Sequence, residues 1–324
     1  MATRAILHRA YGEPGNGLDL DEVQLPTPGP WEVLVDVHAS TVTHHQRLAV
    51  QGRPYRSRLL KGLRRPRPQV LGTDFAGRIA GAGSRGGRLR AGDDVFGWCV
   101  GAHAEQAIAP LALVTRRPTG LSAEQAAVVP STGTAALRAV RDAGRVGPGD
   151  RVLVIGASGG VGTFAVQIAK ADGAEVTGVC STTNTDLLRS IGTDHVIDYT
   201  LDDLDPDHGR WDVVIDLVGN RPVADLRRHL TRTGTLVLVG HPSPGSGSEL
   251  RRRTAARVLS GGSSQRLRPL AHRRSRADLE VLGDLIETGR VTPVVSAHYR
   301  LVDVPTALCH FAPGHARGAI AITV

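Results

Sequence analysis

The stretch DRVLVIGASGGVGTFAVQIAK, residues 150–170, sets the expected fold of the chain. Residues 151–155 form a short apolar run rich in β-branched side chains, which is typical of a buried parallel strand. Gly156, Gly159 and Gly162 come next, and apolar residues at helical spacing follow them. A strand, a glycine turn and a helix in this order allow close backbone approach and point free N–H groups at a pyrophosphate. The stretch therefore predicts a nucleotide site.

The segments around this stretch alternate between strand and helix patterns. Apolar runs predict strands at residues 175–180, 195–198, 211–218 and 235–240, and helical spacing predicts helices at 122–126, 132–143, 185–191 and 223–230. Such alternation predicts an open, doubly wound parallel sheet. Residues 241–265 are rich in Gly, Ser and Arg and predict no regular element.

The first part of the chain, residues 1–118, has a β-rich pattern, with strands expected within residues 31–38, 69–82, 91–97 and 103–109. Residues 52–68 are basic and contain no acid, which fits either a solvated loop or a positive rim for an anionic ligand. Residues 276–288 have the pattern of an amphipathic helix, closed by Gly289. Residues 294–324 return to short strands, which we expect to rejoin the first domain. The predicted fold class is α/β, with a β-rich domain and a doubly wound domain.

Composition limits the class of protein. The chain has 324 residues, 41% of them hydrophobic and 22% charged, which fits a soluble protein of two globular domains. No apolar run is long enough to span a membrane, and residues 1–15 have no signal-peptide core, so we expect a cytoplasmic protein. The three cysteines form no C-x-x-C pair. The net charge of +8 comes almost entirely from scattered arginine, and aromatics make up only 3%, so nucleic acid is not an expected partner.

Several motifs together carry a family resemblance. They are GASGGVGTFAVQIAK, VLGTDFAG, AGDDVFG, STGTAALRA, TDHVIDYT, DLVGN and HARGAIAITV, and they follow one another in similar order from about residue 5 to residue 324. With these motifs the chain resembles the zinc-independent medium-chain dehydrogenases/reductases, especially quinone oxidoreductases and zinc-free NAD(P)-dependent alcohol dehydrogenases. The resemblance implies a GroES-like catalytic domain at residues 1–118, completed by 268–324, and a Rossmann domain at 119–267. It also implies NADPH, a homodimer, and hydride transfer to a quinone or an activated C=C bond.

The positions that correspond to zinc ligands carry mainly hydroxyl side chains. By resemblance, these positions hold Thr43, Thr73 and either Ser131 or Thr132, and the family's four-cysteine lobe is absent. Zinc requires thiolate, imidazole or carboxylate ligands at set positions. We therefore expect no metal. Zinc-free relatives usually carry Asn and Asp where this chain has Thr43 and Gln46, so substrate handling can differ.

The expected cofactor site combines residues from several strand ends. No acid follows the strand at 175–180, so the usual NAD determinant is missing there, and the hydroxyls of Ser181 and Thr182 could donate to a 2′-phosphate. The resemblance adds Tyr199 to this pocket and Thr134 to the nicotinamide side, although each could equally be an ordinary structural residue. Arg317 could compensate for the cations that relatives carry at Thr183 and Ala319. The remaining candidates are the glycine-turn residues Gly156, Ser158, Gly159, Gly160, Val161 and Gly162, and the strand-end residues Val218, Gly219 and Gly240.

Two side chains are candidates for the catalytic step. By resemblance, His45 lies beside the nicotinamide, where its imidazole could protonate the product, and Tyr55 borders the substrate cleft. Solvent is the alternative proton donor. We interpret Asp198 and Asp216 as structural, since each ends a strand. The prediction is an NADPH-dependent, zinc-free reductase of quinones, enones or enoyl substrates. One alternative is a recruited biosynthetic enzyme with a single intermediate as substrate, and another is a non-catalytic nucleotide- or RNA-binding protein.

Overall fold

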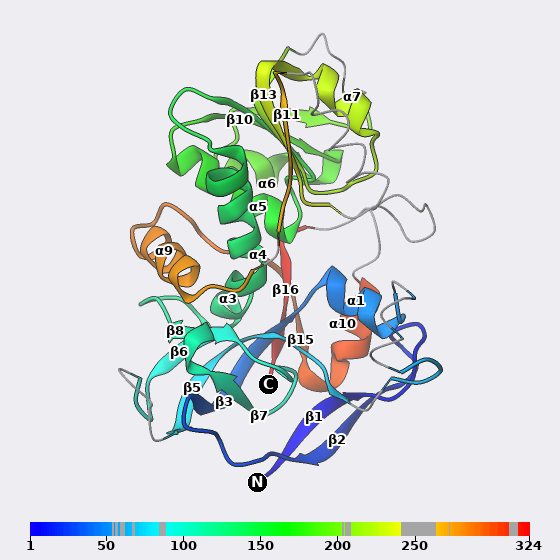
Figure 1. The fold of residues 1–324 in the computed structure, drawn as a ribbon, viewed down its shortest axis with the longest axis vertical. Coiled ribbons are helices and arrows are strands. Elements are labelled where there is room, and N and C mark those ends of the chain that lie inside the picture. The colour runs from blue at the N-terminus through cyan, green and yellow to red at the C-terminus, as the bar shows by residue number, and fades with distance from the viewer. Residues whose placement is uncertain are drawn as a thin grey trace. The chain divides into compact units, whose positions relative to one another are not determined.

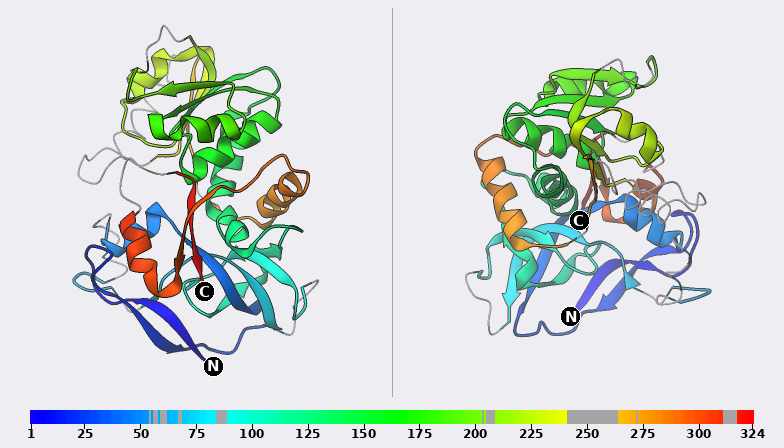
Figure 2. Two further views of the ribbon diagram at one scale, coloured as in Figure 1. Left: turned by 180° about the vertical axis from the view of Figure 1, so that it is seen from behind. Right: turned by 45° about the horizontal axis from the view of Figure 1, so that its top comes forward.

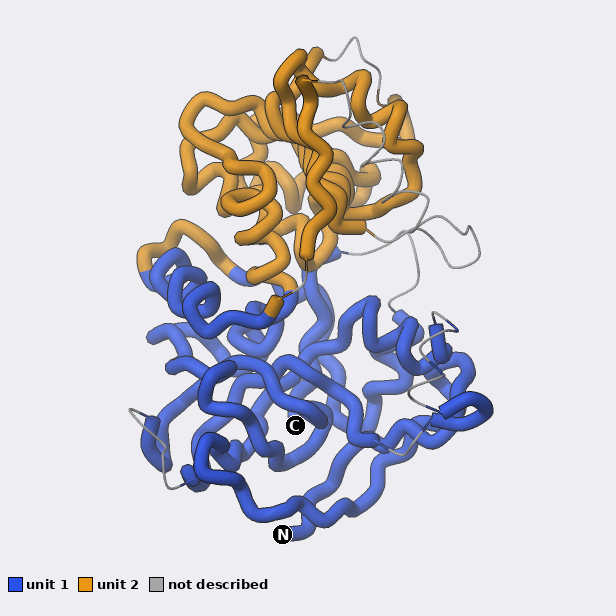
Figure 3. Tube along the Cα trace, viewed as in Figure 1, with its two compact units in different colours: residues 1–131, 274–287, 293–324 blue, residues 132–273, 288–292 orange. Residues whose placement is uncertain are grey.

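The computed structural model describes residues 1–53, 55, 58, 62–66, 69–83, 89–202, 204, 209–240, 264–271, 273–310 and 317–324. Nearly all of the segment at 241–265, for which no element was predicted, lies outside the described residues. The chain divides into two compact units (Figure 3). Unit 1 comprises residues 1–131, 274–287 and 293–324, and unit 2 comprises residues 132–273 and 288–292. The functional domains predicted at 1–118 with 268–324, and at 119–267, stay a prediction.

Unit 2 contains the doubly wound sheet that the sequence predicted. Within the described residues it has six strands in the order β11-β10-β9-β12-β13-β14, and every neighbouring pair is parallel. The strands are β9 (Arg151–Ile155), β10 (Glu175–Cys180), β11 (His195–Asp198), β12 (Trp211–Asp216), β13 (Leu230–Leu238) and β14 (Arg266–Pro269). The predicted bounds of β9, β10 and β11 agree with the structure. No pattern predicted β14, and β13 begins five residues earlier than the predicted strand at 235–240, since Leu230 pairs with Trp211.

Helices connect these strands (Figure 1). They are α5 (Gly160–Ala171), α6 (Thr185–Ser190), which follows the short η4 (Thr182–Asn184), and α7 (Val223–Arg228). A further helix, α4 (Val129–Leu137), starts in unit 1 and precedes β9. The single helix predicted at 132–143 is wrong in one respect: after α4 the chain continues as a π-helical turn, η3 (Arg138–Gly144). Leu153, Trp211 and Leu236 belong to the apolar core of the sheet, and the indole N–H of Trp211 donates to Thr177 Oγ1 at 3.2 Å.

Unit 1 is β-rich. Its described part has a sheet ordered β15-β16-β3-β5-β6-β8, with β7 also paired to β3, and a three-stranded sheet ordered β2-β1-β4. The larger sheet contains β3 (Glu32–Val42), β5 (Asp74–Ala82), β6 (Asp94–Trp98), β7 (Gln106–Pro110), β8 (Val114–Arg116), β15 (Val295–Arg300) and β16 (Ala319–Thr323). The smaller one contains β1 (Ala2–His8), β2 (Leu18–Gln24) and β4 (Gln69–Val70). The helices are α1 (His44–Val50), η2 (Leu111–Leu113), α3 (Ala123–Ala127), α9 (Arg276–Glu287), η6 (Leu301–Asp303) and α10 (Val304–His310).

The tail of the chain completes the sheet of unit 1, as the sequence predicted. β16 runs antiparallel to β3, with Ile320 opposite Val42 and Thr323 opposite Ala39. Figure 2 shows this strand, in red, next to the blue strand β3. The expectation of strands throughout 294–324 is wrong at α10. Val304, Ala307 and Leu308 follow helical spacing and are buried there.

No helix in the part of the chain that the structure describes is long and apolar enough to cross a membrane.

Candidate active site

The glycine turn between β9 and α5 is closely packed. Gly156 has φ +82°, and a Cβ atom added there would lie 2.7 Å from Cγ2 of Val218. A Cβ atom on Gly162 would lie 2.3 Å from the carbonyl oxygen of Gly156 and 2.6 Å from that of Ala157. Glycine is therefore required at both positions, because the first turn of α5 rests directly on the backbone of the turn.

The start of α5 fits a pyrophosphate. Gly159 is the N-cap residue and has no side chain with which to cap the helix, whose first residues are Gly160, Val161 and Gly162. The first N–H groups of a helix have no partner within the helix, and the helix dipole adds partial positive charge at this end. A phosphate group can accept hydrogen bonds from these N–H groups.

The neighbouring strand ends lie against the same turn. A Cβ atom on Gly240 would lie 2.5 Å from the carbonyl carbon of Val218 and 2.6 Å from the backbone nitrogen of Gly219. The buried carboxylate of Asp216 accepts from the N–H groups of Val218 (3.1 Å) and Gly219 (3.0 Å). The structure thus brings Val218, Gly219 and Gly240 together with Gly156, at the carboxyl edge of the sheet where ligands of doubly wound folds bind. Through these two hydrogen bonds, Asp216 fixes the backbone at this edge of the sheet.

Asn184, which the sequence analysis missed, joins the glycine turn to the end of β10. Its side-chain amide donates to Ser158 Oγ at 3.3 Å and to Ser181 Oγ at 3.2 Å. Asn184 and Ser158 are both buried. Nothing in the local pattern marked Asn184, because its two partners come from different segments.

The end of β10 carries hydroxyl groups that are already bonded. Thr182 Oγ1 donates to Asp198 Oδ2 at 2.5 Å, and Thr200 Oγ1 donates to Asp198 Oδ1 at 2.7 Å. Ser181 Oγ lies 3.2 Å from Thr183 Oγ1. The bond from Thr182 is the main cause that lowers the pKa of Asp198, so this carboxylate is ionised at neutral pH. The sequence shows no acid after β10, but the fold places one there from β11.

The carboxylate of Asp198 also acts on its neighbour in the sheet. Cys180, the last residue of β10, pairs in register with Asp198. Burial, followed by the negative charge of Asp198, raises the pKa of the Cys180 thiol to about 11. Cys180 is therefore a neutral thiol at physiological pH.

The other cofactor candidates are spread over both units. Tyr199 follows β11 with 49% of its surface exposed, and its N–H donates to the carbonyl of Cys180 at 3.0 Å. Thr134 is buried within α4. Arg317 is exposed and precedes β16, so it belongs to unit 1 rather than to the unit that holds the glycine turn. Their contacts with a nucleotide stay predictions.

The two catalytic candidates both lie in unit 1. His45 is an exposed residue in the first turn of α1, a helix that begins with a reciprocal cap between Thr43 and Gln46. Tyr55 is 65% exposed, and the guanidinium of Arg58 lies 4.9 Å from its ring centroid and 4.4 Å from that of Tyr11. Arg58 therefore holds the described part of the basic loop against Tyr11.

A buried polar chain, which the sequence did not indicate, anchors α1. His103 Nδ1 lies 2.8 Å from Ser40 Oγ, and its Nε2 lies 3.2 Å from Gln46 Oε1. That oxygen also accepts from the N–H of Thr43, while the amide nitrogen of Gln46 donates to Thr41. Nε2 of His103 must therefore carry the proton, and Nδ1 accepts from Ser40. Burial lowers the pKa of His103 to about 3, so the imidazole is neutral at physiological pH.

A second buried network includes Thr73 and Ser131, two of the positions that by resemblance were expected to correspond to zinc ligands. Asp74 accepts from the N–H of Ser131 (2.8 Å), from its hydroxyl (2.7 Å) and from the hydroxyl of Thr73 (2.8 Å). The indole of Trp98 donates to Ser131 Oγ at 3.2 Å. Burial raises the pKa of the Asp74 carboxyl. Across the described residues, no three His, Cys, Asp or Glu side chains gather as a metal site.

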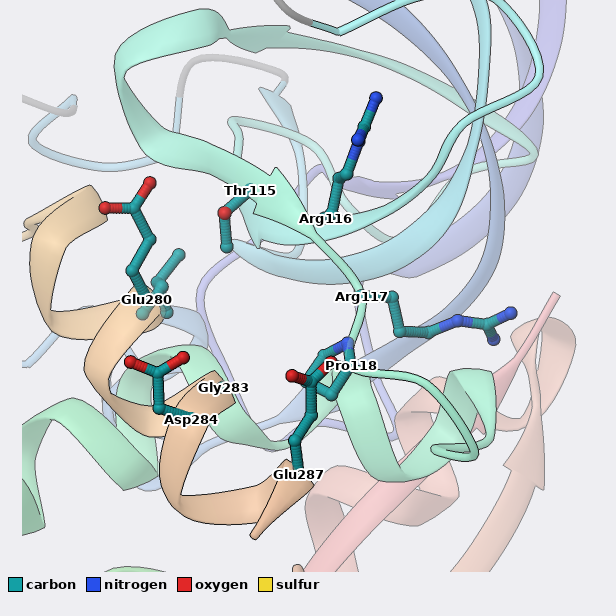
Figure 4. Close-up of a pocket in the computed structure, with 9 residues that line it drawn as sticks. Thr115, Arg116, Arg117, Pro118, Glu280, Gly283, Asp284 and Glu287 are labelled. Atoms are coloured by element: carbon teal, nitrogen blue, oxygen red, sulfur yellow. The ribbon is translucent and has the colours of Figure 1, made fainter.

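A separate small pocket lies within unit 1 between β8 and α9 (Figure 4). Its volume is about 180 Å³, and it is lined by Arg116 and Arg117 on one side and by Glu280, Asp284 and Glu287 on the other. Arg116 and Arg117 form ion pairs with aspartates elsewhere in the unit, and Glu280 pairs with Arg276. Glu287 accepts from the N–H of Thr119 at 3.2 Å, so most of the charged groups that line this pocket already have partners.

The fold and the glycine turn define a two-unit protein with a nucleotide-binding doubly wound sheet. The model of the alcohol dehydrogenase GroES-like domain matches residues 29–137, and that of the zinc-binding dehydrogenases matches residues 191–322. A chloroplastic quinone-oxidoreductase, QR1, from Triphysaria versicolor is 30% identical, over 98% of this chain and 98% of its own. The structure of the quinone oxidoreductase from Coxiella burnetii is 28% identical with a TM-score of 0.88, over all of both chains. A mycobacterial structure in complex with NADPH is 25% identical with a TM-score of 0.83, over 99% of this chain and all of its own.

The chain belongs to the medium-chain dehydrogenase/reductase superfamily, in its quinone oxidoreductase-like group. The predicted family, the α/β fold class and the prediction of an enzyme are confirmed. The protein is an oxidoreductase that uses a nicotinamide cofactor and acts on a small molecule. The non-catalytic alternative is left without support.

Proposed function

We propose that the protein is an NADPH-dependent reductase that works without zinc and transfers hydride to a quinone or to the activated C=C bond of an enone or enoyl substrate. The packed glycine turn at the start of α5 carries the proposal, because two of its glycines leave no room for a side chain. Relatives named as quinone oxidoreductases and a neighbour in complex with NADPH support the substrate class and the cofactor.

The residues of this chain would hold the cofactor and orient it. The N–H groups at the start of α5 would bind the pyrophosphate, and the ends of β9, β12 and β13 would form the floor beneath it. When bound, the reduced nicotinamide supplies the hydride. Asn184 fixes the turn relative to the end of β10, where the adenosine ribose of a dinucleotide binds in doubly wound folds.

The direct experiment measures NADPH consumption with a panel of quinones, enones and enoyl thioesters, together with elemental analysis for zinc. Turnover that survives a chelator, in protein without stoichiometric zinc, is the expected result. Zinc at one equivalent together with turnover that a chelator abolishes would overturn the zinc-free part of the proposal. A cytoplasmic location and a homodimer are also proposed, and light scattering on the purified protein tests the dimer.

His45 is proposed as the proton donor. We expect His45→Ala to lower turnover about tenfold or more, since general acid–base groups contribute about a hundredfold or more. It should also flatten the pH–rate profile between about pH 6 and pH 8, because the variant lacks the histidine that the proposal makes the titrating proton donor. NADPH affinity should hardly change, since the glycine turn belongs to the other unit.

The matched control for this prediction is His195→Ala, which removes an exposed histidine of unit 2 that pairs with Glu175 at 2.8 Å. Steady-state kinetics of both variants on one good substrate make the comparison. Full turnover and an unchanged pH profile in His45→Ala would show that solvent is the donor.

A further inference from the structure

The site that would receive the adenosine ribose contains a fixed negative charge. In doubly wound folds an acid after the second strand recognises the ribose 2′-hydroxyl, whereas a cation nearby accommodates a 2′-phosphate. Here the strand that follows the glycine turn is β10, and its end has only hydroxyl side chains. The register between β10 and β11 places Asp198 opposite Cys180, so the carboxylate comes from the adjacent strand.

The carboxylate of Asp198 is held in place on both sides. One oxygen accepts from Thr182, and the other accepts from the hydroxyl and the N–H of Thr200. In the part of the chain that the structure describes, no Lys or Arg forms an ion pair with Asp198, whose side chain interacts with Thr182 and Thr200, and the residue is half-buried. The negative charge is therefore ordered, and its bonding partners are neutral.

The hydroxyls nearby do not offset this charge. Thr182, one of the two predicted donors to a 2′-phosphate, donates its hydroxyl proton to Asp198 instead. Ser181 shares a hydrogen bond with Thr183 and also accepts from Asn184. A phosphate monoester carries nearly two negative charges at neutral pH, and like charges repel strongly at short range.

We propose that Asp198 is the residue that sets cofactor selectivity: its carboxylate opposes a 2′-phosphate and favours a ribose with a free 2′-hydroxyl. The inference rests on the proposed nicotinamide cofactor, and it limits the preference for NADPH over NADH to a small ratio. Thr182 and Thr200 are positioning residues, because they fix the carboxylate and act through it.

The test is direct titration of NADPH and NADH, by ligand fluorescence or calorimetry, into wild-type protein and Asp198→Asn, without substrate. The expected result is a ratio of NADPH to NADH affinity that rises about tenfold in the variant, since removing one nearby like charge is worth about that factor in a partly solvated site. Most of the rise should come from tighter NADPH binding. The difference in this affinity ratio between wild-type protein and Asp198→Asn should be smaller at about 0.5 M salt than at low salt, because salt screens charges at the surface.

Two further variants keep the result interpretable. Asp186→Asn removes the same charge from the exposed first turn of α6, where it pairs with Arg189, and should leave the ratio within about twofold. Asp198→Ser keeps a hydroxyl beside Thr182 and Thr200, and should raise the ratio as Asp198→Asn does. For both variants, only nucleotide binding is measured, without substrate.

The possible outcomes separate the two proposals. An unchanged ratio in both Asp198 variants, with both nucleotides still bound, overturns the role of Asp198 and leaves the reductase intact. An equal loss of affinity for both nucleotides likewise shows a structural role and overturns the inference. If wild-type protein binds neither nucleotide, the proposed cofactor fails and the inference fails with it.

Discussion

Lowering the pH from 7 to 5 is expected to remove about 2 kcal/mol of unfolding free energy from the wild-type protein through His103 alone. The folded pKa of His103 is about 3, while an unfolded histidine titrates near 6.5. The unfolded state therefore binds a proton over this range and the folded state does not. The stabilisation is fully present above pH 6.5 and is lost as the pH falls toward 3, at about 1.4 kcal/mol per pH unit.

Denaturant unfolding of wild-type protein and His103→Gln at pH 7 and pH 5 measures this effect. Glutamine keeps an N–H donor for Gln46 and an acceptor for Ser40, and it does not titrate. The free energy of unfolding lost between pH 7 and pH 5 should be larger in the wild type than in the variant by about 2 kcal/mol. The matched control is His195→Gln, an exposed histidine beside Glu175, which should follow the wild type closely. Equal losses in the wild type and His103→Gln would show that this imidazole does not govern acid stability.

Gly162→Ala should weaken NADPH binding about a hundredfold. Its Cβ atom would lie 2.3 Å from a backbone oxygen, so α5 has to move away from the turn by about 1 Å to reach ordinary contact. We expect a displacement of that size to weaken binding by a factor similar to the one that a 1 Å misplacement costs in catalytic rate, about a hundredfold. Overpacking should also lower the free energy of unfolding by about 1 to 3 kcal/mol.

The control for this variant is Gly283→Ala in α9, where the nearest atom to an added Cβ is Cγ of Pro118 at 3.7 Å. Both substitutions place alanine in a helix, but only one of them meets backbone. Gly283→Ala should leave NADPH binding unchanged and add about 0.5 to 1 kcal/mol of stability. Titration with NADPH measures the affinity of both variants, and thermal unfolding measures their stability. Similar NADPH affinities in the two variants would contradict the packing argument.

The sequence predicted the doubly wound sheet well, because its signals are local. β9, β10 and β11 are short β-branched runs bounded by turns, and their bounds agree with the structure. The helix α10 and the strand β14 were missed, since each is short and its type is decided by packing against distant segments. The glycine turn was predicted for the same reason as the strands: the spacing of its glycines lies within one segment.

The polar parts of the candidate site could not be predicted, because their partners are far apart in sequence. Asp198 meets Thr182 across sixteen residues, and His103 meets Ser40 across sixty-three. Such pairs depend on strand order and register, which the local pattern does not determine. The segment that directly follows β10 contains no acid, as the sequence indicated. The fold nevertheless places the carboxylate of Asp198, from β11, beside that segment.

The pairing of β16 with β3 has a consequence for synthesis on the ribosome. β3 is made early, but β16, which pairs with the Ala39–Val42 end of β3, is made after all of unit 2. Unit 2 can therefore fold before β16 has been added to the sheet of unit 1, since domains fold as units during translation. Until β16 has been synthesised, the Ala39–Val42 end of β3 lacks this pairing, whereas β7 can already pair with Glu32–Asp36, so the nascent chain presents a short unpaired strand edge to chaperones.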